Sequence, residues 1–216
     1  MYGLFLGIHC ADGTLPKYKG ANQYLWEFSD RDKEAADFVI KLLKKEFSEF
    51  NLNVHIKQRG NQYVVFVKNK KFWNFLTKEL KLPIGRKAET IDVPMSVTQT
   101  ELKNFVNGVI SSDGFVFQDW NGTPRIRIKI RSKLLRDSLS RILISLDIKN
   151  TIGQSEEKLV PPRSKKIYQI TMYRLDVYGK NAIKYFNEIG IWHPIKHKKF
   201  LIFLDALESR ETGAPR

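Results

Sequence analysis

Two short segments of the 216-residue chain each carry an aspartate directly before a glycine. One reads FLGIHCADG and ends at Asp12 and Gly13; the other reads VNGVISSDG and ends at Asp113 and Gly114. Carboxylate oxygens are ligands that hard divalent cations prefer. Two acids brought side by side raise a pKa or recruit a cation. One Asp-Gly pair is an ordinary turn, but two copies in matching surroundings predict a pair of acids that holds a divalent metal between them.

The acids need elements that bring them together, and both segments are predicted to be helices. Gly3, Gly7 and Ala11 recur every four residues and therefore share one helical face. Gly108 and Ser112 repeat this spacing in the second segment. Rows of small side chains let two helix backbones approach closely. Each acid would then lie at the C-terminal end of its helix, where the helix dipole disfavours negative charge, and a divalent cation is the expected compensation.

The remaining elements follow in the same order around each segment. Thr98 and Glu101 form a capping box that predicts the start of the second helix, which should run to about Ser112. Asn121-Gly122 predicts a type I′ hairpin turn. Alternating and helical hydrophobic patterns then predict an amphipathic helix, a second strand pair and a closing helix in each half. We therefore expect an α+β fold of two pseudo-twofold-related αββαββα halves with antiparallel sheets.

The repeat also predicts where the halves begin and end. We expect a first half at 1–84, a linker at 85–97, a second half at 98–210 and a tail at 211–216. The second half is longer by about ten residues, which we place in the polar stretch Gly153–Lys166. The strands expected are Val54–Arg59, Tyr63–Lys68, Phe115–Trp120, Pro124–Arg131, one from Thr151 onward, and Ile167–Tyr173, with a turn at Lys19–Asn22. The helices expected are two amphipathic ones through Phe38–Phe47 and Leu135–Leu146, and three more at Lys70–Leu80, Val177–Ile189 and Lys199–Glu208.

The chain is strongly basic, and its basic residues follow a strand pattern. Lys and Arg number 37 against 23 Asp and Glu, a formal charge of +14, which favours a polyanionic partner. Basic residues alternating with apolar ones along a strand share one face, which suits duplex DNA. Such a row should repel itself unless a partner is present. The residues expected to contact DNA are Arg125, Arg127, Lys129, Arg131, His55, Lys57 and Arg59, joined by Lys17, Lys19, Gln23, Glu27, Gln169, Thr171 and Tyr173.

The two acid segments and the repeated αββαββα order resemble the LAGLIDADG homing endonucleases of the single-chain type, similar to archaeal intron-encoded members. The motif departs from the family pattern where Cys10 and Ser111 replace its first acid. The acids that are catalytic in that family match Asp12 and Asp113. The resemblance implies a monomer whose two sheets form a saddle on a long, asymmetric duplex DNA target. It further implies that both strands are cut across the minor groove, leaving short 3′ overhangs.

The resemblance also implies cofactors and helper residues. Mg²⁺ is the expected cofactor; Mn²⁺ would substitute, and Ca²⁺ would support binding without cleavage. Ala11 and Ser112, beside the acids, are the further expected metal-contacting positions. A basic residue near each site is expected at Lys87 and Lys198, each four residues after a Pro-Ile proline, with Lys199 as a competitor. The family's water-positioning residue falls near Asp30, Arg31 or Arg131, and we leave that role unassigned.

Other functions remain open at this point. An RNA maturase on the same fold would bind its own intron RNA without needing cleavage. A transcription regulator on this scaffold should have lost at least one acid. The single cysteine, Cys10, excludes a disulfide framework and favours an intracellular protein, cytoplasmic in a prokaryote or organellar in a eukaryote. Neither a signal peptide nor a membrane-spanning helix is expected.

Overall fold

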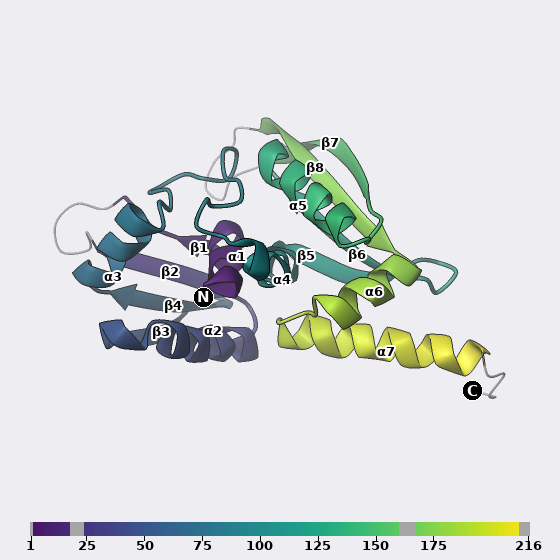
Figure 1. Cartoon of the computed structure of the whole chain (residues 1–216), viewed down its shortest axis with the longest axis horizontal. Helices are drawn as coiled ribbons and strands as arrows, with labels where there is room; N and C mark the ends of the chain where they lie inside the picture. The colour runs from purple at the N-terminus through teal and green to yellow at the C-terminus, as the bar shows by residue number, and fades with distance from the viewer. Residues whose placement is uncertain (1, 18–23, 160–166, 212–216) are drawn as a thin grey trace.

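The computed structural model describes residues 2–17, 24–159 and 167–211 and has two halves of the same design (Figure 1). The first half contains α1 (Gly3–Ala11), β1 (Gly13–Thr14), β2 (Leu25–Asp30), α2 (Lys33–Glu46), β3 (Val54–Arg59), β4 (Gln62–Lys68) and α3 (Lys70–Asn74), which continues as a π-helical turn over Phe75–Glu79. The second contains α4 (Leu102–Asp113), β5 (Gly114–Gln118), β6 (Pro124–Ile130), α5 (Lys133–Ser145), β7 (Thr151–Leu159), β8 (Tyr168–Tyr178), α6 (Lys180–Glu188) and α7 (Pro194–Glu211). None of these helices is long and apolar enough to cross a membrane.

Each half contains one antiparallel sheet, and the two sheets have equivalent strand orders, β1-β2-β4-β3 and β5-β6-β8-β7. The registers agree as well, because Gly13 pairs with Phe28 and Gly114 pairs with Ile128. Positions in the two sheets can therefore be matched outward from the motif glycines. By this match Asp30, the last residue of β2, corresponds to Ile130, the last residue of β6. The α+β fold of two αββαββα halves is confirmed.

Helices α1 and α4 lie side by side at the centre of the molecule (Figure 1). A Cβ atom on Gly7 would lie 2.2 Å from the carbonyl oxygen of Phe105 and 2.8 Å from the Cα of Gly108. A Cβ atom on Gly108 would lie 2.5 Å from the carbonyl oxygen of Leu4. No side chain fits at these distances, so both positions require glycine. The close approach predicted from the row of small residues is present.

One side chain caps both central helices. The predicted capping box is present, with Glu101 accepting a hydrogen bond from the backbone N–H of Thr98 at 3.2 Å. Its other carboxylate oxygen accepts from the backbone N–H groups of Tyr2 and Gly3, at 2.6 and 3.1 Å. Glu101 thereby satisfies two free N–H donors at the start of α1 as well. The two helices are tied at their N-terminal ends, opposite the acids.

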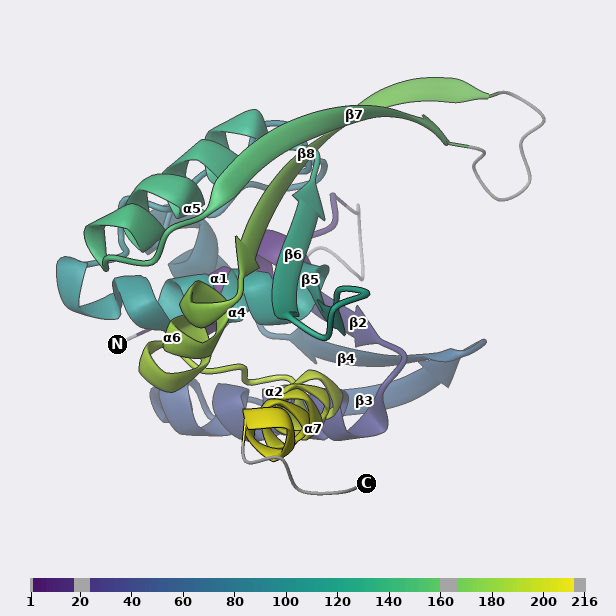
Figure 2. The same ribbon diagram turned by 90° about the vertical axis from the view of Figure 1, so that its right-hand side faces the viewer.

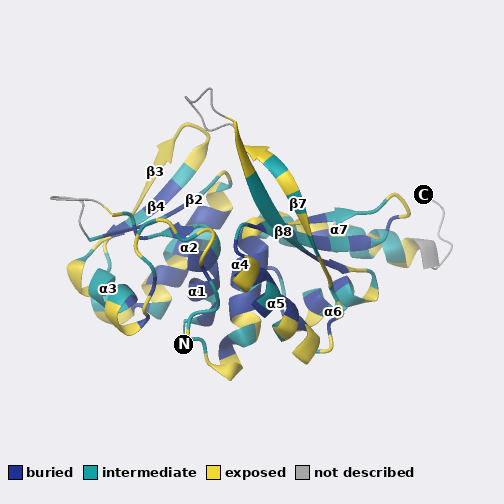
Figure 3. Ribbon diagram, turned by 90° about the horizontal axis from the view of Figure 1, so that it is seen from above, coloured by how far each residue is buried: buried dark blue, intermediate teal, exposed yellow. Residues whose placement is uncertain are grey.

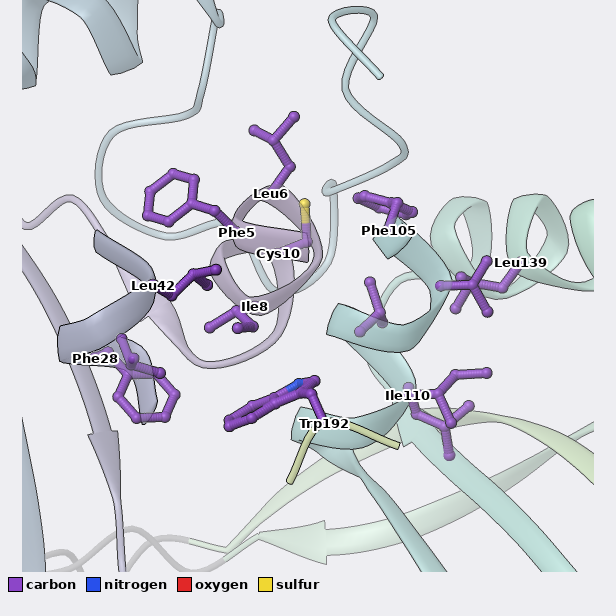
Figure 4. Packing of buried hydrophobic residues seen from close by; sticks show 14 of the residues in the cluster. Phe5, Leu6, Ile8, Cys10, Phe28, Leu42, Phe105, Ile110, Leu139 and Trp192 are labelled. Atoms are coloured by element: carbon purple, nitrogen blue, oxygen red, sulfur yellow. The ribbon is translucent and has the colours of Figure 1, made fainter. Parts of the chain in front are cut away.

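The hydrophobic core runs without interruption from one half to the other. Figure 4 shows Phe28 of the first half and Ile110 of the second on either side of Trp192. The Trp192 ring stacks on Phe38 at a centroid distance of 5.0 Å, and its Nε1 donates to the carbonyl of Gly108 at 3.4 Å. Figure 3 shows α1 and α4 largely buried, whereas β3 is exposed along most of its length.

The polar stretch after Gly153, where we placed the extra residues of the second half, continues the strand expected from Thr151. Gly153–Leu159 belongs to β7, and the β7–β8 hairpin reaches beyond the rest of its sheet (Figure 2). Strand β8 also continues to Tyr178, so the closing helix begins at Lys180, not at Val177. Ladder pairing with Ile126 and Arg125 of β6 outweighs the helical pattern at Val177 and Tyr178.

Two other local expectations are wrong. The Asn121-Gly122 turn is not type I′, because Gly122 has a positive φ of 80° and Asn121 does not. The strands stop pairing at Gln118 and Pro124, leaving a loop too long for a two-residue turn. The last helix starts at Pro194, five residues before the expected Lys199, because proline suits the first helical position. The predicted turn at Lys19–Asn22 lies outside the described residues.

Replacing Gly7 by alanine tests the close helix contact. Alanine favours an ordinary helix over glycine by about 1 kcal/mol, so propensity alone would stabilise the variant. The contact with Phe105 instead predicts overpacking that lowers the free energy of unfolding by about 1–3 kcal/mol, measured by urea denaturation. Lys41→Ala, on the exposed face of α2, is the control and should change stability by less than about 0.5 kcal/mol. A Gly7→Ala protein more stable than the parent would contradict the packing.

Candidate active site

Asp12 and Asp113 lie at the C-terminal ends of the paired central helices. Asp12 follows α1 and donates its backbone N–H to the carbonyl of Ile8 at 2.9 Å, while Asp113 is the last residue of α4. Asp12 is half-buried and lines a cavity of about 80 Å³ together with residues of β2, β3 and β4. Asp113 is exposed and lines a cavity of about 250 Å³ that includes Lys87, Lys129 and Arg131. The helix pair thus presents one acid to each of two neighbouring cavities.

Both acids hold their protons more tightly than ordinary aspartates. The pKa of Asp12 is raised to about 7, first because burial disfavours the charged form and then because Asp113 and Asp30 are negative. Lys196 and Lys87 act in the opposite direction. The pKa of Asp113 is also raised, because nearby protein removes part of its hydration, and the same two lysines oppose this change. The arrangement disfavours two free negative charges and favours a cation between them.

Lys87 and Lys196 bind the carbonyl ends of the two central helices in equivalent ways. The Lys87 Nζ donates to the carbonyls of Cys10 and Ala11 at 2.6 and 3.0 Å. The Lys196 Nζ donates to the carbonyls of Ser111 and Ser112 at 2.7 and 2.5 Å. Burial lowers the pKa of both lysines, and the aspartates oppose this change. A positive charge therefore stands at each helix C-terminus, where the helix dipole favours it.

Lys196, which the sequence argument missed, takes the position that we expected for Lys198 or Lys199. Lys198 is exposed and pairs with Glu34 at 3.2 Å, and the exposed Lys199 lies over the ring of Phe203. The two Pro-Ile segments fold differently: Pro194 starts a helix, whereas Lys87 follows its proline through a loop with Gly85 at a φ of 84°. A helix rises only 1.5 Å per residue, so a lysine nearer the proline fills the equivalent position.

The ligand atoms that Asp12 and Asp113 offer suit a small divalent cation only if a bound substrate supplies further ligands to the metal's coordination shell. Within the described ranges no three His, Cys, Asp or Glu side chains form a metal cluster. Mg²⁺ commonly binds through one or two carboxylates, substrate phosphates and water, which fits Asp12 and Asp113. The carbonyls expected to assist, those of Ala11 and Ser112, already accept hydrogen bonds from the lysines. A metal near them would compete with the two ammonium groups.

The motif positions that depart from the family pattern are structural. His9 and Cys10 are buried, and the Nδ1 of His9 accepts a hydrogen bond from the indole of Trp26 at 3.1 Å. Burial, helped by the charge of Lys87, holds the pKa of His9 well below its usual range. Burial also raises the pKa of the Cys10 thiol to about 12. Both side chains are neutral parts of the core.

The exposed face of the first sheet lies beside Asp12. His55, Lys57 and Arg59 of β3 are exposed on this face, as expected. The Lys57 Nζ lies over the ring of Phe66 at 4.7 Å, and Arg59 lies 3.9 Å from Glu27. Glu27 and Arg59 line the Asp12 cavity. Basic groups therefore continue outward from this acid.

The basic row on β6 does not repel itself in the way that we expected, because every member has an acidic partner. The pairs are Arg125 with Asp119 at 3.2 Å, Arg127 with Asp176 at 2.5 Å, Lys129 with Glu157 at 2.8 Å, and Arg131 with Glu89. The sequence hid these partners because they come from β7, β8, a turn and the linker. The charge of this sheet face is thus partly balanced within the protein.

Some of the other expected contact residues lie elsewhere. Ile130 pairs with Tyr173 and Glu156 pairs with Thr171, so strand alternation puts Gln169, Thr171 and Tyr173 on the opposite face from Lys129. They nevertheless line one cavity together with Arg131, the last residue of the basic row. Lys17 is exposed. Lys19 and Gln23 fall outside the described residues.

Family comparison agrees with this geometry in both halves. A domain described as LAGLIDADG-like matches residues 100–190, and the WhiA LAGLIDADG-like domain matches residues 2–77. The chain is a two-motif LAGLIDADG protein. None of the curated proteins matches the sequence.

Solved structures share the fold at low identity. The endonuclease I-DmoI, in complex with DNA and Mn, is 20% identical with a TM-score of 0.59 over 87% of this chain and 94% of its own. I-WcaI, bound to its DNA recognition sequence, is 14% identical with a TM-score of 0.55 over 90% and 84% of the two chains. The N-terminal LAGLIDADG domain of WhiA is 12% identical with a TM-score of 0.51 over 89% and 83%. The fold therefore occurs both in homing endonucleases and in WhiA.

The lysine assignment can be tested on stability. Lys196→Met removes a charged donor from two carbonyls, so we expect the free energy of unfolding to fall by about 1–3 kcal/mol. Lys198→Met removes an exposed ion pair and should cost at most about 1 kcal/mol. Both are measured by urea denaturation beside the parent. Equal losses for the two variants would contradict the special position of Lys196.

Proposed function

We propose that this protein is a metal-dependent DNA endonuclease that cuts both strands of a long, asymmetric duplex target. The observation that carries the proposal is the acid pair at the C-terminal ends of the paired helices α1 and α4, each acid with a raised pKa and within reach of a lysine's charge. Perturbed acids and bases gathered beside cavities are typical of catalytic sites. A purely structural role gives no reason to place two carboxylates there.

The two sheets supply the binding surface in this proposal. In this proposal duplex DNA lies across the exposed strand β3 and the partly exposed basic face of β6, where the phosphates meet His55, Lys57, Arg59 and the β6 row. The acids paired with the β6 row compete with phosphates for its arginines and lysine. Because one chain contributes both acids and both sheets, the protein acts as a monomer.

Hydrolysis at each strand needs an oriented water and compensation for charge on the phosphate. Bound Mg²⁺ would supply Lewis-acid stabilisation of the phosphate and the leaving oxygen. Asp12 and Asp113 would hold that cation, while Lys87 and Lys196 would place positive charge beside the phosphates. A water oxygen attacks phosphorus as the bond to the leaving oxygen breaks, and the proton of the water passes to solvent. Mn²⁺ can replace Mg²⁺, and the looser shell of Ca²⁺ supports binding alone.

The alternative is a protein on this fold that binds nucleic acid without cutting it. The match of residues 2–77 to the WhiA LAGLIDADG-like domain supports this alternative. An intron RNA maturase is a second kind of protein that would bind nucleic acid without cutting it. The acid pair argues against it, because non-cleaving binding gains nothing from two desolvated carboxylates. The cleavage test below separates the two functions.

Binding should depend steeply on salt and respond to the internal ion pairs. With about six to ten phosphate contacts, affinity should fall by about 10³–10⁵-fold between 50 and 200 mM salt. Glu157→Gln releases Lys129 from its ion pair, so affinity for the duplex should rise. The slope of log affinity against log salt concentration should steepen by up to about the value for one added phosphate contact. Anisotropy of a labelled duplex in Ca²⁺ measures both. Glu79→Gln, exposed at the far end of the first half, is the control; an equal gain there would refute the role of the Lys129 pair.

Asp12→Asn tests the acid pair. A raised carboxyl pKa means that the folded state binds a proton more readily, so stability falls as pH rises from about 4 through 7. The variant lacks this loss and should be at least as stable as the parent above pH 7. It should still bind a duplex selected with the parent in Ca²⁺, but make no double-strand breaks in Mg²⁺.

Asp113→Asn should behave in the same way, with nicking of one strand permitted. Melting curves, gel shifts and plasmid cleavage are measured on all three proteins. Undiminished double-strand cutting by Asp12→Asn would refute the catalytic assignment. Tight binding without cutting by the parent would favour the maturase or regulator instead.

A further inference from the structure

Aromatic side chains gather on the half of the second sheet that ends in the β5–β6 loop. Cross-strand pairing sets Phe115 opposite Arg127, and it sets both Phe117 and Tyr178 opposite Arg125, so these rings share the face of the basic row. Phe115 and Tyr178 are 41% and 45% exposed, and the rings of Phe115 and Phe117 stack at a centroid distance of 5.4 Å. The guanidinium groups of Arg125 and Arg127 lie over the Phe117 ring, 5.7 and 5.3 Å from its centroid. This part of the sheet is therefore a layer of rings and arginines.

Trp120 adds a further ring in the β5–β6 loop itself. Its side chain is 98% exposed, and Figure 1 shows this loop at the end of the second sheet away from α1 and α4. The backbone N–H of Asp119 donates to the carbonyl of Thr123 at 2.9 Å, and the Asp119 carboxylate pairs with Arg125 at 3.2 Å. The loop is thus closed and tied to the basic row. A tryptophan held in water leaves a large apolar area that a partner would cover favourably.

We refer to these four side chains together as the aromatic face: Phe115, Phe117, Trp120 and Tyr178.

The first sheet has no ring at any of the positions that the described residues allow to be matched with the aromatic face. Matched outward from the motif glycines, those positions hold Thr14, Pro16 and Lys68. The position of Arg125 is taken by the apolar Leu25. A duplex that spans both sheets would need the same kind of surface on each. The aromatic face is therefore suited to a ligand present at one end of the molecule only.

Exposed rings beside arginines suit unpaired bases better than paired ones. In a duplex the bases stack on one another and present only their edges in the grooves. An unpaired base presents its flat faces, which stack on aromatic side chains and on guanidinium planes. Aromatic and arginine side chains also concentrate in protein interfaces. The formal charge of +14 and the continuity with the basic row favour a polyanion over a protein.

We propose that the aromatic face binds a single-stranded stretch of DNA that continues from one end of the bound duplex. The paired DNA lies along the basic row, and the junction between paired and unpaired DNA falls near Arg125. The first unpaired bases stack on the exposed rings, and their phosphates meet the arginines. This inference rests on the DNA binding of the proposed function but not on cleavage. Because only the second sheet carries these rings, an asymmetric target gains contacts at one of its two ends.

The test compares blunt and extended forms of a duplex selected with the parent and trimmed to its minimal length. Binding is measured by anisotropy in Ca²⁺, so no cutting is needed. A single-stranded extension of about eight nucleotides, within the site sizes of small single-strand-binding folds, is added to each end in turn. At one end it should tighten binding by about 5–150-fold, as expected when one base stacks on a ring. An abasic extension keeps the phosphates but removes the bases, and it should lose most of that gain.

Variants of the protein then locate the gain. Trp120→Ala should remove most of the gain from the extension while leaving the affinity for the blunt duplex close to that of the parent. Trp120→Phe keeps a ring and should retain much of the gain. Met95→Ala is the matched control, because Met95 is 93% exposed but lies outside the aromatic face. It should bind the blunt, extended and abasic DNAs as the parent does.

Four results would overturn the proposal. Equal gains at both ends, or a gain that survives in the abasic extension, would mean that phosphates alone are bound. An equal loss of affinity for the blunt duplex in Trp120→Ala would place this ring against paired DNA instead. Tighter binding of an RNA extension than of the DNA extension would overturn the assignment to DNA. A parent that gains affinity at one end but cuts no duplex would support this site while refuting the endonuclease function.

Discussion

The contact between the backbones of α1 and α4 is the constraint on which the rest of the molecule depends. Gly7 and Gly108 let the helices meet with no side chain between them. This separation brings Asp12 and Asp113 to one place and sets the distance between the two sheets that follow them directly in the chain. Any side chain at the crossing would move the acids and the sheet faces together. Glu101 fixes the opposite end of the pair, so the helices cannot pivot freely about their crossing point.

Elements that depend on interactions between residues near one another in the chain could be predicted from the sequence. The row of small residues, the capping box and the alternating strands each depend on residues close together in the chain, and the acid pair follows from the repeat of one short motif, so all four can be predicted from the sequence alone. Long-range partners were not predictable in this way. Nothing near Lys196 in the sequence distinguishes it from Lys198, because the difference arises from Pro194 starting a helix. Likewise, the partners of the β6 row lie up to about 50 positions away in the chain, as Arg127 and Asp176 illustrate.

The net charge of the chain predicted less about individual side chains than the other sequence features did. The surplus of basic residues predicts a polyanionic partner, but it cannot say which cations are free. Lys57 has only an aromatic ring beneath it, whereas Lys129 is held by Glu157. Exposed ion pairs of this kind contribute little to stability, about 0–1 kcal/mol each. Their larger effect is on position, because each acid holds its basic partner at a fixed place on the sheet. A phosphate that displaces the acid then meets a cation already in place.

Neither candidate site belongs to one half alone. The cavity at Asp113 includes Cys10 and Ala11 of the first half. The Asp12 site receives the charge of Lys196 from the second half, whose His193 also contacts Asp30 at the end of β2. Trp192, directly before that histidine, fills the core between the halves and stacks on Phe38. The same short segment therefore joins the halves and completes the first site. A substitution in this segment that made the two sites alike would also disturb the packing between the two halves. This double role gives a physical reason for the two sites to remain different.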